Sequence, residues 1–204
     1  ANSISSTRTL PMDIQTLAVH AGHQSESAED LIHPVSPAII LSSTFQRNPD
    51  GSCPGGYLYS QINNPNRSAL ESAIAKLEGA RDAVAFASGS AAMMAVLQSL
   101  KPGDHVLAPL AMYYGSRTML GGIFRQWGLQ TTFAPMDDLE QVGAAITPAT
   151  RLVITETPSN PTLRITDLRE VTRIAHAAGA LVLCDNTWST PILQRPIEFG
   201  VDLV

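Results

Sequence analysis

From about residue 66 onward, short apolar runs alternate with longer segments in which apolar residues recur every three or four positions. Runs of the first kind are typical of buried strands, and segments of the second kind are typical of amphipathic helices. The predicted strands are residues 82–87, 105–110, 131–135, 151–157 and 180–185. The predicted helices are residues 66–79, 88–100, 113–127, 137–146 and 166–179, with Asn66 and Thr166 as candidate caps. Strands that alternate with helices of this length predict an α/β fold, in which a mostly parallel sheet is covered by helices on both faces.

The first 56 residues lack this alternation and are rich in Ser, Pro and Gly. Residues 49–56 are a loop by their turn chemistry, and one short helix is predicted near residues 13–20. We therefore predict an extended arm over residues 1–56 that makes oligomer contacts. Residues 57–204 form the main domain, which we expect to be incomplete at its C-terminal end.

Composition narrows the class of protein. The chain has 204 residues, of which 44% are hydrophobic, and a net charge of -5 without a Lys/Arg run, so neither nucleic acid nor a membrane is an expected partner. Cys53 and Cys184 make no CxxC pair, and no apolar leader is visible, which favours a cytoplasmic setting. His20 and His23 form a lone HxxH, and no metal site is predicted.

Ligands of open parallel sheets bind at the carboxyl ends of the strands, where four turns of this sequence carry polar groups. Gly89, inside Ser88-Gly89-Ser90, opens a helix and so suits a phosphate. Tyr113 follows the strand 105–110 and could stack on a flat ring. Asn160 lies between two prolines and could donate to a ligand oxygen, and Asp185 could pair with a protonated pyridine nitrogen.

Each turn also has a purely structural interpretation. Ser88 could be a plain helix cap, Tyr113 a half-buried aromatic and Asn160 an Asx-turn residue. Asp185 could cap a helix or pair with an arginine, either Arg173 or Arg195. Taken together, the four turns supply what a protein needs to hold pyridoxal 5′-phosphate, except the lysine that forms the Schiff base.

The chain resembles the Cys/Met-metabolism pyridoxal-phosphate enzymes, among them cystathionine γ-synthase, cystathionine β- and γ-lyases, methionine γ-lyase and O-acetylhomoserine sulfhydrylase. The matching stretches are AVHAG (18–22), LSSTF (41–45), YSQINNPNR (59–67), ASGSAA (87–92), LKPGDHVL (100–107), YYGS (113–116), TETPSNPTL (155–163), CDNTW (184–188) and FGVDL (199–203). The resemblance implies a fold-type I pyridoxal-phosphate transferase domain. It also implies a homotetramer, a dimer of dimers, whose sites are shared between subunits.

Roles for individual residues follow from the resemblance alone. Asp185, with Thr187 beside it, would pair with the pyridine nitrogen, and Gly89 and Ser90 would bind the cofactor phosphate. The remaining implied positions are the ring-stacking and acid–base Tyr113, the amide donor Asn160, and Tyr59, which would reach the phosphate of a neighbouring subunit.

The chain departs from the family pattern at several positions. Gln61 replaces the usual arginine of the YSR motif, and Gly115 lies where methionine γ-lyases carry a reactive cysteine. The family's Schiff-base lysine is expected beyond residue 204, because the only lysines here are Lys76 and Lys101.

The function that the resemblance implies is C–S bond cleavage, a β- or γ-elimination of cystathionine or a related sulfur amino acid. Three alternatives stay open: a γ-replacement transferase of the cystathionine γ-synthase or O-acetylhomoserine sulfhydrylase type, a non-catalytic fragment without its lysine, or another pyridoxal-phosphate enzyme such as an aminotransferase.

Overall fold

The computed structural model describes residues 12–21 and 36–204. The chain divides into two compact units. The first comprises residues 1–77 and 81–83, and the second comprises residues 78–80 and 84–204. This division lies later in the chain than the predicted boundary after residue 56, and the role of residues 1–56 as an arm for oligomer contacts stays a prediction.

The first unit contains the helix α1 (Ile14–His20), the short turn η1 (Pro54–Gly56) and the helix α2 (Pro65–Glu78) except its last residue. The short helix predicted near residues 13–20 is confirmed. Asn66 does not cap α2, because Asn64 Oδ1 accepts the Asn66 amide at 2.9 Å. The Asn66 side chain instead pairs with the Ile40 backbone, accepting its N–H at 3.0 Å and donating to its C=O at 2.8 Å.

The second unit is built on a sheet of the strands β1 (His105–Pro109), β2 (Gln130–Ala134), β3 (Thr150–Glu156) and β4 (Leu181–Asp185). Their order is β2-β1-β3-β4, and every neighbouring pair is parallel. Beyond β4, Leu203 makes a parallel bridge to Leu183. The predicted α/β class with a parallel sheet is confirmed.

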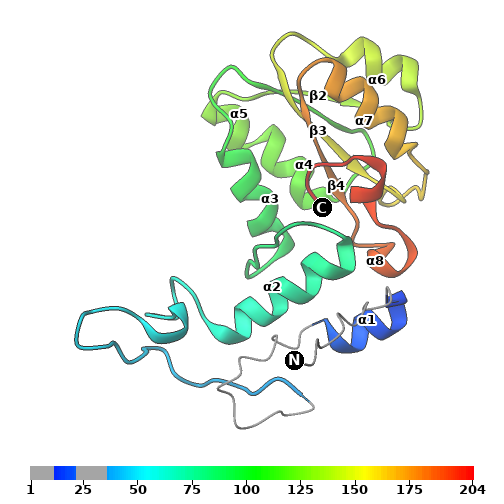
Figure 1. The fold of residues 1–204 in the computed structure, drawn as a ribbon. Helices are drawn as coiled ribbons and strands as arrows, with labels where there is room; N and C mark the ends of the chain where they lie inside the picture. Colours follow the sequence, from blue (N-terminus) through cyan, green and yellow to red (C-terminus); the bar gives the residue numbers. More distant parts are fainter. Residues whose placement is uncertain (1–11, 22–35) are drawn as a thin grey trace, which may run out of the picture. The chain divides into compact units, whose positions relative to one another are not determined.

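Helices cover both faces of this sheet, as predicted (Figure 1). One face packs against α3 (Gly89–Gln98), α4 (Tyr114–Gly121) and α5 (Ile123–Trp127), and the other against α6 (Leu139–Ala145) and α7 (Leu168–Ala177). Residues alternate between the two faces along each strand, since Val106 and Leu107 belong to opposite clusters. After β4, the chain forms the short helix α8 (Thr190–Leu193) and the turn η2 (Pro196–Phe199).

Three predicted elements differ from the structure. Residues 82–87 form no strand, because no strand in the described part of the chain pairs with them, and Val84 is 71% exposed. The helix predicted over 113–127 breaks at Gly122, whose backbone (φ -104°, ψ -99°) is not helical. Asp167 rather than Thr166 caps α7, since its carboxylate accepts the Glu170 amide at 3.1 Å.

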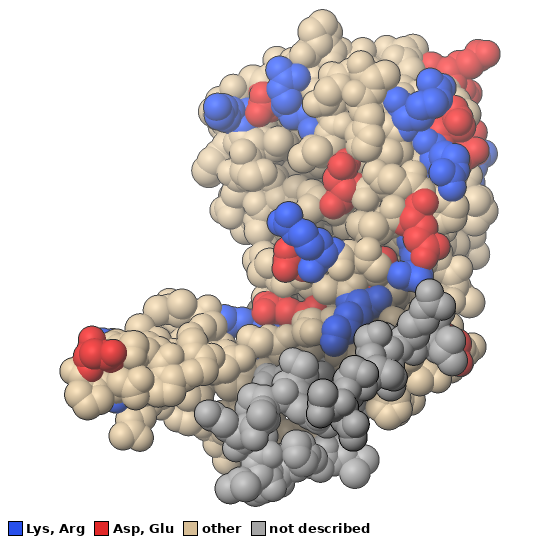
Figure 2. All heavy atoms as spheres, in the orientation of Figure 1, with Lys and Arg blue, Asp and Glu red and all other residues tan. Residues whose placement is uncertain are grey.

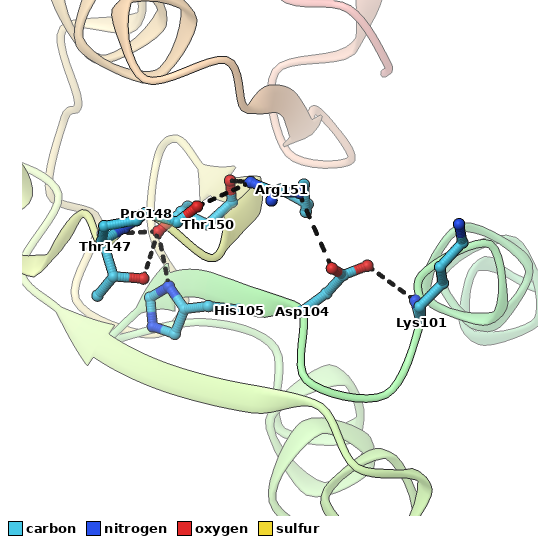
Figure 3. Close-up of polar contacts among 7 residues, drawn as sticks. All are labelled: Lys101, Asp104, His105, Thr147, Pro148, Thr150 and Arg151. Carbon is cyan, nitrogen blue, oxygen red and sulfur yellow. Dashed lines mark hydrogen bonds and ion pairs between the residues drawn. The ribbon is translucent and has the colours of Figure 1, made fainter.

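A buried histidine ties three strands together at the amino end of the sheet. His105 is 3% exposed, and its ring lies 2.8 Å from Thr150 Oγ1 on β3 and 2.9 Å from Thr132 Oγ1 on β2. Around it, the Lys101 amide donates to Asp104 at 2.8 Å, and Asp104 pairs with Arg151 (Figure 3). This end of the sheet is therefore closed by polar contacts that belong to the fold.

Charged side chains of both signs are interspersed on the face of the second unit seen in Figure 2. None of the helices within residues 12–21 and 36–204 combines the length and the apolar character needed to cross a membrane.

Candidate functional site

The start of α3 offers unpaired backbone donors. Ser88 is the cap, and its hydroxyl accepts the Ala91 amide at 3.2 Å. The amides of Gly89 and Ser90 belong to the first turn, where no intrahelical acceptor exists. A Cβ at Gly89 would meet open space, so an incoming anion can approach this backbone closely. Capping by Ser88 and anion binding are thus compatible.

Tyr113 lies between β1 and α4 and is 46% exposed. Its amide donates to Glu156 Oε2 at 2.7 Å. Its ring folds back over Gly115, since a Cβ built there would lie 2.5 Å from Tyr113 Cε1. Any side chain at position 115 would therefore displace this ring.

Asp185 ends β4 with one carboxylate oxygen committed and the other available. Oδ1 accepts both the amide of Thr187 at 3.0 Å and its hydroxyl at 2.5 Å. No residue within the described ranges donates to Oδ2. The alternative of an ion pair is wrong, because the two candidate arginines, Arg173 and Arg195, pair at 2.8 Å with Glu170 and Glu198.

The turn after Asp185 is stabilised by hydrogen bonds of the buried Asn186 side chain. Asn186 is 6% exposed and donates to the Gln194 carbonyl at 2.9 Å. The Gln194 amide donates in return to Asn186 at 2.9 Å and to the Thr157 carbonyl at 3.1 Å. These contacts join the ends of β3 and β4, which fixes the backbone that presents Asp185.

Asn160 is half-buried in the loop after β3. Its side chain makes no hydrogen bond with any residue that the structure describes. Ser159 organises the turn instead, because its hydroxyl contacts Thr162 at 2.8 Å and accepts the Arg164 amide at 3.0 Å. The Asx-turn interpretation of Asn160 is therefore wrong, and its amide is free to meet a ligand.

A second carboxylate stands beside Asp185, and the sequence reasoning did not single it out. Glu156 ends β3, pairs in register with Asp185 and is 3% exposed. Burial raises the pKa of its carboxyl to about 7, the Tyr113 amide opposes the shift, and the charge of Asp185 adds to it. The signal for Glu156 was a carboxylate after an apolar strand, the same signal that pointed to Asp185.

A cavity of about 270 Å³ opens at the carboxyl ends of β1, β2 and β3. Its lining combines apolar residues with the charged groups Asp137, Glu156 and Arg164. Arg164 and Asp137 form an ion pair at 2.8 Å. The full set of lining residues is Pro109, Leu110, Ala111, Pro135, Met136, Asp137, Glu156, Ser159, Thr162, Arg164 and Thr166.

A common buried cluster connects three of the predicted turns. Met93 lies one turn into α3, Met112 directly precedes Tyr113, and Leu183 lies two residues before Asp185. All three belong to the same cluster. The start of α3, the turn after β1 and the end of β4 are therefore anchored in one core.

The other predicted positions lie elsewhere. Tyr59 belongs to the first unit, is 46% exposed and bridges Thr44, so its role stays a prediction. Lys76, also in the first unit, donates to the Ala21 carbonyl at 3.2 Å. Lys101 lies beside Asp104 at the amino end of the sheet (Figure 3), whereas Asp185 ends β4 at the carboxyl end.

These groups suit a planar heterocycle that carries an anion at one end and a protonated nitrogen at the other. The free amides of α3 match a phosphate, and the free Oδ2 of Asp185 matches the protonated nitrogen. The fold is therefore an α/β domain whose strand ends carry groups of the kind that pyridoxal-phosphate-binding domains use.

Comparisons with known proteins agree with this class. Residues 15–204 match the family described as Cys/Met metabolism PLP-dependent enzyme. The chain belongs to this family, whose cofactor is pyridoxal 5′-phosphate. The match favours it over the aminotransferase alternative.

Similar proteins include a cystathionine gamma-synthase of Mycobacterium tuberculosis, 41% identical over 93% of this chain and 48% of that protein. The cystathionine beta-lyase MetC of Bacillus subtilis is 42% identical over 83% of this chain and 43% of that protein. The solved structure of cystathionine gamma-lyase from Lactobacillus plantarum, complexed with L-serine, is 37% identical with a TM-score of 0.87. It covers 94% of this chain and 49% of the solved one. The chain thus spans about half the length of these relatives.

Proposed function

We propose that the protein is a pyridoxal-phosphate enzyme that cleaves the C–S bond of cystathionine or a related sulfur amino acid by β- or γ-elimination. The observation that carries the proposal is Asp185, because Thr187 holds one of its oxygens and leaves the other free at the carboxyl edge of the sheet. The names of relatives support the substrate class, since they include a cystathionine beta-lyase and a cystathionine gamma-lyase.

Each predicted residue has a defined task in this proposal. Asp185 Oδ2 accepts from the pyridine nitrogen and keeps it protonated, while Thr187 orients the carboxylate. Gly89 and Ser90 donate backbone N–H groups to the phosphate at the start of α3. Asn160 donates its side-chain amide to the phenolic oxygen of the cofactor and helps to orient the substrate carboxylate.

Tyr113 has two tasks, one through its ring and one through its hydroxyl. The ring would stack on the pyridine ring, and the hydroxyl would hold or release a proton as the sulfur departs. Bound pyridoxal phosphate supplies an electron sink that stabilises negative charge on the substrate. Asp185 strengthens this sink because its charge opposes loss of the ring proton.

Assembly and cell compartment are part of the same proposal. A homotetramer, arranged as a dimer of dimers, would let Tyr59 of one subunit reach the phosphate held by another. Gln61 replaces the arginine expected beside it, so this part of the phosphate contact is neutral rather than charge-assisted. A cytoplasmic location fits two cysteines that form no disulfide in the structure.

The test compares Asp185→Asn with wild type, both expressed from the complete reading frame and loaded with pyridoxal phosphate. Loss of the carboxylate should lower turnover about 10²–10³-fold without changing the melting temperature by more than a few degrees. Asp167→Asn is the matched control, because asparagine also caps helices and the Asp167 carboxylate accepts the Glu170 amide rather than contacting Asp185. Wild-type-like turnover in Asp185→Asn with the cofactor bound contradicts the proposal.

Product analysis separates elimination from the alternative of γ-replacement. Elimination from cystathionine releases a thiol, ammonia and a 2-oxo acid, whereas replacement consumes a thiol and an activated homoserine ester and forms a thioether. Replacement is the second candidate because a cystathionine gamma-synthase is among the similar proteins. Thioether formation without 2-oxo acid release would favour it.

A further inference from the structure

We propose that Glu156 is a positioning residue, which holds the backbone amide of Tyr113 and thereby sets where the Tyr113 ring meets the cofactor. This inference rests on the proposed role of Tyr113. It concerns a side chain that none of the predicted site roles includes.

The geometry at the start of α4 supports this role. Tyr113 is the N-cap residue of α4, yet its own side chain makes no capping hydrogen bond. The Glu156 carboxylate reaches the Tyr113 amide at 2.7 Å from the end of β3. Glu156 is only 3% exposed and its strand lies between two others in the sheet, so the position of this acceptor is fixed.

A second contact restrains the other end of Tyr113. Its ring lies so close to Gly115 that a Cβ at that position would be 2.5 Å from Cε1. The amide is therefore held by Glu156 and the ring rests on a backbone without a side chain. The two restraints leave the ring little freedom, as a stacking partner for a flat cofactor requires.

The strength of the hydrogen bond between Glu156 and the Tyr113 amide depends on pH, because the Glu156 carboxyl can ionise. Burial raises the pKa of Glu156 to about 7, so its carboxyl is partly protonated at neutral pH. The ionised form accepts the Tyr113 amide more strongly than the neutral form. The charged or titratable groups around Glu156 are Asp185 and Cys184 on β4, Tyr113 before α4, and Asp137 and Arg164 across the cavity.

The experiment uses Glu156→Ala and Glu156→Gln, made in the protein expressed from its complete reading frame. Glu156→Ala removes the acceptor, whereas Glu156→Gln keeps a carbonyl acceptor that cannot ionise. Glu140→Gln, in the first turn of α6, is the matched control for the same chemical change. Melting temperature and size-exclusion profile establish that each variant is folded.

The first readout needs no cofactor. Hydrogen exchange of the apo protein, followed by mass spectrometry of peptides that contain residues 110–117, should be faster in Glu156→Ala than in wild type. Exchange in Glu156→Gln should be close to wild type at low pH and show no added protection above pH 7. Unchanged exchange in Glu156→Ala overturns the proposal, whether or not the cofactor assignment is correct.

The second readout reports how the Tyr113 ring meets the cofactor. Pyridoxal phosphate is titrated into each protein, and its visible circular dichroism is recorded between pH 6 and 8. Glu156→Ala should bind the cofactor about tenfold more weakly, with an altered dichroic band, and Glu156→Gln should lose the change around pH 7. Wild-type affinity and dichroism in Glu156→Ala overturn the inference.

Failure of the proposed function and failure of the proposed role of Glu156 give different results. If the wild-type protein binds no pyridoxal phosphate, the proposed function fails while the exchange readout still decides the role of Glu156. If Glu156→Ala does not fold, the pH dependence of Glu156→Gln decides it, because the glutamine side chain still accepts the Tyr113 amide but cannot ionise. An unchanged pH profile in Glu156→Gln then refutes the inference.

Discussion

The buried His105 makes a prediction that can be worked through from its contacts. Replacing it by alanine removes the hydrogen bonds to Thr150 and Thr132, at 2.8 and 2.9 Å. Thr150 Oγ1 keeps a partner, since it still accepts the Thr147 amide at 2.8 Å, and Thr132 is only partly buried. The loss is therefore that of two ordinary hydrogen bonds, about 1–3 kcal/mol of unfolding free energy in total.

The same histidine also makes stability depend on pH in a definite direction. Burial lowers the pKa of His105 below its usual 6.5. The unfolded chain therefore takes up a proton at a higher pH than the folded chain does. As pH falls below 6.5, stability should fall, at up to about 1.4 kcal/mol per pH unit until the folded form is protonated as well.

Urea unfolding of the apo protein at fixed concentration, between pH 5 and 8, measures both effects. His105→Gln should be less stable at pH 8 and should show a shallower loss of stability below pH 6.5. His176→Gln is the control, because it removes a histidine that lies on the surface beside Asp202. A loss well under about 1 kcal/mol in His105→Ala, with an unchanged pH slope in His105→Gln, would refute the argument.

Three further predictions follow from other contacts. Asp167→Ala should lower unfolding free energy by about 1 kcal/mol, measured by urea titration, because it leaves the Glu170 amide at the start of α7 uncapped; no loss would mean that water caps α7 equally well. Burial raises the pKa of Cys184 to about 12, so iodoacetamide should spare it in the native protein and modify it in urea, as intact mass reveals; native labelling would contradict its burial. Gly115→Ala should displace the Tyr113 ring and weaken cofactor binding about fivefold, an expectation that unchanged affinity in an absorbance titration would rule out.

Hydrophobic periodicity was sufficient to predict the sheet and the helices that cover it. The runs at 105–110, 151–157 and 180–185 became β1, β3 and β4, because strands buried on both faces are apolar throughout. The same signal failed at residues 82–87. An apolar run becomes a strand only where a neighbour supplies hydrogen bonds, and the presence of a neighbour cannot be determined from the run itself.

Caps and turns were predicted less well, because several polar residues competed for each position. Asn64 rather than Asn66, and Asp167 rather than Thr166, supply the acceptor at the start of α2 and α7. The chain offers each helix two suitable side chains in close succession, and the loop before the helix decides which one points back.

The structure places Asp185 at the end of a strand, as predicted, and its role toward the cofactor stays a prediction. Asp185 has the free oxygen that its role requires, and its candidate arginine partners bind elsewhere. Glu156 follows an apolar strand just as Asp185 does, but its contact with Tyr113, 43 residues away in the sequence, could not be predicted from that pattern. Such a contact follows from strand order, which periodicity does not reveal.

The strand order β2-β1-β3-β4 also bears on how the chain acquires its structure. His105, which starts β1, lies in register with Gln130 and Thr150, so each pairing must close a long loop before it gains any hydrogen bond. Parallel neighbouring strands cannot form from a tight hairpin, because a crossover segment, here a helix, has to connect them. Refolding of this unit should accordingly be slow for its size, with its helices ahead of its sheet.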